Sequence, residues 1–140
     1  MVVGCGGEDA PTREEFARSA NAICADLERQ GEALGETKVT SPDEVTAFTE
    51  RARQTTREAV ERIRELEVPE GADGEVARAW QDEIASQAED ELIPALDRVE
   101  RAAKEGDKQE LLAAAQELEA VESARAERLA ADLGADRCAE

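Results

Sequence analysis

The feature of this sequence that most constrains its fold is a repeated signal for the start of a helix. Residues 12–15, 41–44 and 107–110 each begin with Thr, Ser or Asp and end with Glu three positions later. In such a capping box the first side chain accepts a hydrogen bond from the backbone N–H of the Glu, whose carboxylate reaches back to the helix start. Pro42 strengthens the second signal because proline is favoured at the first helical position.

Apolar residues after these starts recur at steps of three, four or seven, which is the period of one face of an α-helix. A composition rich in Ala, Glu, Leu and Arg agrees with long helices. We therefore predict an all-α fold, a single up-down-up-down four-helix bundle over residues 12–140, preceded by a flexible N-terminal tether with a lipobox remnant over residues 1–11. The predicted helices cover residues 12–35, 41–66, 73–106 and 107–133.

Two residues inside this pattern carry specific expectations. Pro94 lies within the third apolar run and removes the backbone bond to residue 90, at a cost of about 3 kcal/mol if nothing relieves it. Because the apolar spacing continues on both sides, we predict a kink between Asp90 and Pro94 rather than a chain break. Gly134 follows the last apolar residue, where a left-handed C-cap glycine belongs.

Composition excludes several functions. The chain has 140 residues and a formal net charge of −18, which disfavours nucleic acid and anionic membrane surfaces as partners. It contains no His, so His-based acid–base catalysis and the usual His-ligated metal sites are excluded. Aromatic residues make up 2%, and Ala supplies much of the apolar content, which predicts a thin core. High charge also favours disorder, but the regular apolar spacing argues against it.

The first of the three cysteines ends a tetrapeptide that looks like a bacterial lipobox. Residues 2–5 read Val-Val-Gly-Cys, and the polar, Gly-rich residues 6–9 are typical of a tether after a lipidated cysteine. No charged and long apolar signal segment stands before them in this sequence. We predict lipidation of Cys5, with an upstream signal peptide missing from this chain. The alternative is a cytosolic N-terminus with an incidental cysteine.

The other two cysteines, Cys24 and Cys138, are the candidates for a disulfide. Cys24 lies within the apolar stripe of the first helix, and an antiparallel bundle brings the end of the fourth helix to the start of the first. The tail can then reach Cys24, because extended residues span about 3.3 Å each. A cross-link of this length contributes about 4–5 kcal/mol in the chain-entropy model. The alternative is a pair of unrelated free thiols, with Cys24 buried as a small hydrophobe.

Four short motifs stand in order along this sequence. They are the lipobox-like start, Phe16 followed by Cys24 after seven residues, a Val68-Pro69 linker, and Leu133-Gly134 ahead of Cys138. Together they resemble small secreted helical lipoproteins of high-GC Gram-positive bacteria, although Ala135 and Ala139 stand where members of that group often carry Leu and Gly. The resemblance implies an extracytoplasmic location and no particular reaction.

Other candidate residues have simpler interpretations. The acidic run over residues 89–91, with Glu83 before it, could hold a divalent cation, but it lacks the Gly-centred loop of an EF-hand and reads better as a solvated face. Trp80 could stack on a ligand, although a single Trp on an apolar stripe is more often a core anchor. No Ser, Thr or Cys has an identifiable base. We predict no catalytic, metal or cofactor-binding residues.

The sequence therefore predicts an extracytoplasmic, lipid-anchored, non-enzymatic helical protein that binds a partner or serves structurally at the cell surface. Its expected partner is the membrane, through the acyl anchor, and its protein or small-molecule partner stays open. Two alternatives remain. One is an extracytoplasmic carrier of a small ligand or cation, using the bundle interior near Trp80 and Pro94. The other is a cytosolic helical adaptor with reduced thiols.

Overall fold

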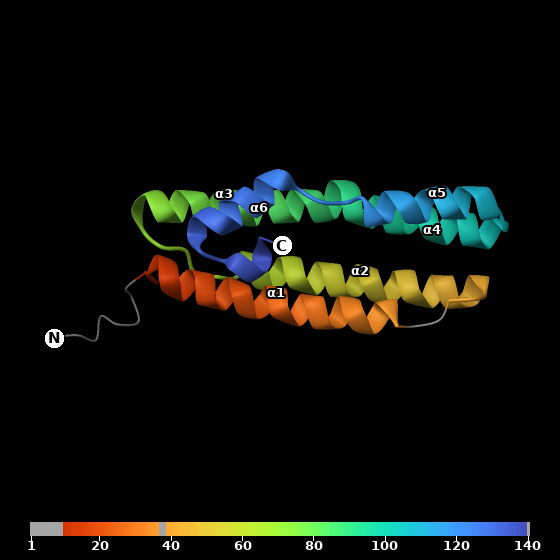
Figure 1. Cartoon of the computed structure of the whole chain (residues 1–140), viewed down its shortest axis with the longest axis horizontal. Coiled ribbons are helices and arrows are strands. Elements are labelled where there is room, and N and C mark those ends of the chain that lie inside the picture. Colours follow the sequence, from red (N-terminus) through yellow and green to blue (C-terminus); the bar gives the residue numbers. More distant parts are fainter. Residues whose placement is uncertain (1–9, 37–38, 140) are drawn as a thin grey trace.

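The computed structural model describes residues 10–36 and 39–139, and every regular element in these two ranges is helical. One layer contains α1 and α2, and a long helical rod with two shorter helices packed against it forms the other (Figure 1). The all-helical prediction is therefore confirmed. The elements are α1 (Arg13–Gly35), α2 (Pro42–Arg64), α3 (Gly71–Gln87), η2 (Ala88–Leu92), α4 (Ile93–Glu105), α5 (Lys108–Glu119), α6 (Ala124–Leu133) and η3 (Asp136–Cys138).

The predicted helix starts at residues 12, 41 and 107 are present. The side chain of Thr12 accepts a hydrogen bond from the backbone N–H of Glu15, whose own side chain accepts one from the backbone N–H of Thr12. Ser41 and Asp107 accept the equivalent backbone bonds at the starts of α2 and α5. Each contact satisfies one of the free N–H groups at a helix start, so these local signals set where the helices begin.

The third helix continues through Pro94, as expected, and starts slightly earlier than expected, at Gly71. Its distortion is a π-helical segment, η2, immediately before the proline. The N–H of Ile93 bonds to the carbonyl of Ala88, five residues back, instead of four. Pro94 has no N–H to offer the preceding turn, and a single wider turn lets α3 and α4 continue as one rod.

The prediction of one helix over residues 107–133 is wrong. The chain leaves helical geometry between α5 and α6, and Ser123 starts the second helix by accepting a hydrogen bond from the N–H of Ala126. The break lets α5 pack on α4 while α6 packs on α3 (Figure 1). It escaped the prediction because Val121 continues the apolar spacing across it.

The core is divided between the two ends of the molecule. The larger cluster lies where α1, α3 and α6 meet and is centred on Phe16 and Trp80, which are 1% and 0% exposed. A smaller cluster at the other end includes Val45 and Val99. Most remaining buried residues are alanines, so the core is thin, as predicted. The larger cluster supports the segment of α1 that carries Cys24.

Candidate functional site

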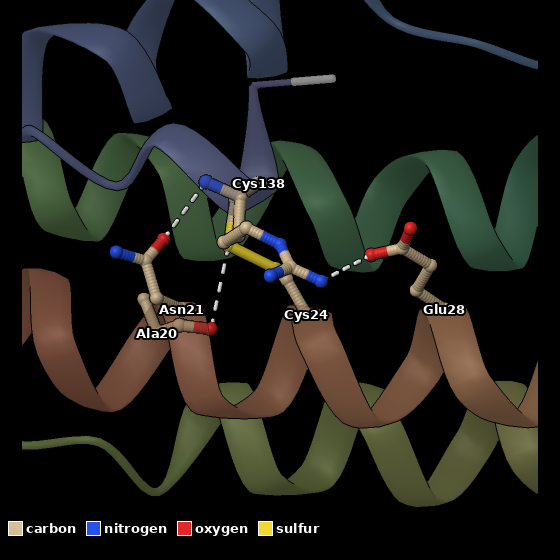
Figure 2. Close-up of a disulfide and its surroundings, with 6 residues drawn as sticks. Ala20, Asn21, Cys24, Glu28 and Cys138 are labelled. Atoms are coloured by element: carbon tan, nitrogen blue, oxygen red, sulfur yellow. Dashed lines mark hydrogen bonds and ion pairs between the residues drawn. A yellow bond between two sulfur atoms is a disulfide. The ribbon is translucent and has the colours of Figure 1, made fainter.

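Cys24 and Cys138 form a disulfide that joins α1 to the C-terminal turn η3 (Figure 2). Their sulfur atoms are 2.03 Å apart, their Cα atoms are 5.4 Å apart, and 114 positions separate them in the sequence. Both side chains are half-buried and pack against the larger core cluster. The bond closes most of the chain into one covalent loop.

The tail reaches α1 because α6 ends in a tight turn. Gly134 adopts the left-handed conformation predicted for it, with φ 79°, where a residue with a Cβ would be strained. The N–H of Ala135 then bonds back to the carbonyl of Ala130 at 2.9 Å. Ala135 itself is 0% exposed. This turn directs η3 toward the middle of α1, opposite Cys24.

Non-covalent contacts flank the disulfide on both sides. The backbone N–H of Arg137 donates to the side-chain oxygen of Asn21 at 3.0 Å, and the Arg137 guanidinium pairs with Glu28. Asn21, Cys24 and Glu28 share one face of α1, because they are three and four residues apart (Figure 2). The sulfur of Cys138 also lies 3.4 Å from the carbonyl oxygen of Ala20. The tail is thus held in place by more than the covalent bond.

A surface depression of about 530 Å³ borders the disulfide. Both sulfur-bearing residues contribute to its lining, together with Leu27 and the Arg137–Glu28 ion pair. The depression therefore opens to solvent beside the two half-buried cysteines. This is the part of the described structure that combines a chemically reactive bond, charged side chains and access.

A polar cluster between α2 and α4 has no counterpart in the sequence-based predictions. Arg53, 14% exposed, contacts Asp97 at 2.9 Å and Glu100 at 2.8 Å, and fully buried Thr49 also donates to Glu100. The hydrogen bond from Arg53 is the main cause that lowers the pKa of Glu100, and the same contact raises the pKa of Arg53. This cluster holds two helices in register. Its members are distant in sequence, so no local signal identifies it.

Trp80 belongs to the core, as the sequence favoured. Its ring meets that of Phe16 edge to face, with centroids 5.9 Å apart. The indole Nε1–H is buried and has no hydrogen-bond partner among residues 10–36 and 39–139. Pro94 lies on the rod as a half-buried residue of α4. Neither residue lines the depression beside the disulfide, although Trp80 belongs to the core cluster against which both cysteines pack.

The acidic residues named in the sequence analysis contact different partners and do not meet at one site. Glu83 accepts a hydrogen bond from Ser123 and pairs with Arg125. Glu89 lies 3.5 Å from Arg64 across a shallow groove of about 490 Å³ between α2 and η2. Within residues 10–36 and 39–139, no group of three or more acidic or Cys side chains is placed to hold a metal ion. The acidic run forms a solvated face.

Cys5, the predicted lipidation site, lies outside the residues that the structure describes. Among the described helices, none has the length and apolar character needed to cross a bilayer. Neither observation bears on whether Cys5 is acylated.

Comparison with known proteins identified no matching family model, no similar curated protein and no similar solved structure. The candidate site therefore rests on the residues and geometry described above.

Proposed function

We propose that this protein is an extracytoplasmic, lipid-anchored, non-enzymatic module that binds a partner or serves structurally at the cell surface. In this proposal the protein is an up-down-up-down four-helix bundle. An acylated Cys5 anchors it to the membrane, and a flexible tether connects Cys5 to the bundle. The observation that carries the proposal is the Cys24–Cys138 disulfide, because disulfides form and persist in oxidising compartments outside the cytosol.

The number and pairing of the cysteines support the same proposal. Of the three cysteines, two are joined to each other, which leaves Cys5 for a different chemistry. The Val-Val-Gly that precedes Cys5 is the context in which a bacterial lipoprotein cysteine is acylated. Net charge disfavours direct contact with anionic headgroups, so a covalent anchor of the multi-chain bacterial type is the means of membrane attachment that fits this chain.

The test is metabolic labelling. The gene with its native upstream DNA would be expressed in a high-GC Gram-positive host supplied with an alkyne-bearing fatty acid. We expect label on the wild-type protein, none on a Cys5→Ala variant, and unchanged labelling of a Cys24→Ala variant. Protease added to intact cells should digest the wild-type protein. Absence of label from the wild type, or protection from the protease, would refute the proposal.

A further inference from the structure

We propose that the Cys24–Cys138 pair is a site of reversible thiol–disulfide exchange with small thiols, and not solely a permanent cross-link. The inference goes beyond the proposed function and does not depend on the lipid anchor. It starts from access, because both cysteines are half-buried and line the solvent-facing depression of about 530 Å³. Exchange requires an attacking thiolate to reach a disulfide sulfur, and this depression provides the approach.

The tail has enough other contacts to stay in place when the disulfide opens. Ala135 is fully buried, the Arg137 backbone N–H bonds to Asn21, and the Arg137 guanidinium pairs with Glu28. These contacts lie on either side of the disulfide along α1. They keep the two sulfur atoms near each other, so the disulfide can form again without the C-terminus first having to find α1.

The surroundings of Cys138 can also accept the reduced thiol form of the pair. In the disulfide, the Cys138 sulfur carries no hydrogen and can only touch the Ala20 carbonyl oxygen, 3.4 Å away. Reduction gives Cys138 an S–H group, which is a weak donor, and that carbonyl oxygen is already within reach.

The step balances without any other reactant. The thiolate of a small thiol attacks one cysteine sulfur, a mixed disulfide forms, and the other cysteine leaves as a thiolate that takes a proton from water. A second small thiol then attacks the mixed disulfide. The small thiol is oxidised to its own disulfide, and the protein is left with two thiols. Closing the site reverses these steps.

The experiment uses the full chain with Cys5→Ser, so that two cysteines remain, in mixtures of reduced and oxidised glutathione at neutral pH without denaturant. Acid quenching, alkylation and mass spectrometry give the fractions of dithiol, mixed disulfide and disulfide. We expect oxidised and reduced starting protein to reach the same ratio, with a trapped glutathione adduct on the way. A native protein that resists reduction while the urea-unfolded protein is reduced would overturn the proposal.

Variants test the role of the flanking contacts. Glu28→Gln should move the equilibrium about twofold toward the dithiol, because an exposed ion pair contributes little. Asn21→Ala should move it about fivefold, because it removes a neutral hydrogen bond. The matched controls, Glu32→Gln and Ser19→Ala, change exposed residues of the same helix and should have no effect. Circular dichroism would verify that each variant is folded. Equal ratios in variants and controls would overturn the positioning role of these contacts.

Discussion

Gly74 stands where α3 passes closest to the loop that enters it. A Cβ at this position would lie 2.0 Å from the backbone oxygen of Pro69, whereas a Cβ at Gly31, in the last turns of α1, would meet nothing within 4 Å. The two glycines, both inside helices, therefore have opposite effects on the stability of the fold. One allows a close approach of two backbone segments, and the other only increases the freedom of the unfolded chain.

We predict that Gly74→Ala lowers the free energy of unfolding by about 1–3 kcal/mol, as overpacking usually does, while Gly31→Ala raises it by about 0.4–1 kcal/mol. Urea unfolding followed by circular dichroism measures both changes. Similar effects of the two substitutions would show that the contact between residue 74 and Pro69 is not tight.

The pair of Arg53 and Glu100 predicts a dependence of stability on pH. The hydrogen bond from Arg53 holds the pKa of Glu100 below the ordinary value of a glutamate carboxyl. Folding therefore favours the ionised carboxylate, and this contribution is present above the ordinary carboxyl pKa and is lost as the pH falls through the lowered pKa of the folded state.

Glu100→Gln should accordingly cost about 1.5 kcal/mol at pH 7, where it removes a hydrogen bond between charged groups. The difference from wild type should shrink as the pH falls through the lowered pKa of Glu100 in the folded state, because the carboxyl is then protonated in both states. Urea unfolding at several pH values measures it. Glu105→Gln, an exposed change on the same helix, is the control. A pH-independent difference would contradict the prediction.

At the scale of elements, local signals were sufficient for the helix starts at residues 12, 41 and 107. Contacts between helices could not be predicted from local signals. Ser41 could be predicted as a helix cap because its partner, Glu44, is three residues away. Gly134 could be predicted as a C-cap because its turn is local. The contacts of Gln81 could not be predicted. Its buried amide donates to the carbonyls of Ile63 and Leu66 at 2.8 and 3.1 Å and so closes the end of α2, but nothing local indicates that α3 passes there.

The candidate site was partly predictable for the same reason. The order of the helices brings the C-terminus back to the first helix, so the pairing of Cys24 with Cys138 could be anticipated. Asn21 and Glu28 could not, because their contacts depend on how the turn after Gly134 lays residue 137 on α1. Likewise, the break before Ser123 depends on α6 packing against α3, which the apolar spacing alone does not specify.

Gln81→Ala should destabilise the protein by about 1–3 kcal/mol, because it removes the side-chain donor of the Leu66 carbonyl and one of the donors of the Ile63 carbonyl. Hydrogen exchange should accelerate in the last turn of α2 more than in α5. Gln116→Ala on the exposed face of α5 provides the comparison. If the two variants exchange alike, Gln81 does not hold the end of α2.

At the scale of the whole molecule, the disulfide compensates for an alanine-rich core. It spans 114 positions, and closing a loop of about 100 residues contributes about 4.7 kcal/mol in the chain-entropy model. Typical domains have a total stability of about 5–15 kcal/mol. The bond is therefore a large part of what keeps this chain folded.

Replacing both cysteines, as Cys24→Ser with Cys138→Ser, should lower the free energy of unfolding by about 4–5 kcal/mol. Denaturant unfolding compares this variant with the oxidised wild type, and Cys5→Ser controls for the loss of a thiol elsewhere. A change below about 1 kcal/mol would mean that the docked tail holds the fold without the covalent bond.

The position of the disulfide also decides how the molecule transmits mechanical force. A pull applied between the two ends of the chain travels through the first part of α1, crosses from Cys24 to Cys138, and leaves by the tail. The residues between the two cysteines, 25–137, which include α2 to α6, lie outside the load path. In a single-molecule force experiment the oxidised protein should lengthen only by its short terminal segments, whereas the reduced protein should release roughly 110 residues, at about 3.3–3.6 Å each. The oxidised protein should therefore bear tension between its two ends while α2 to α6 stay folded.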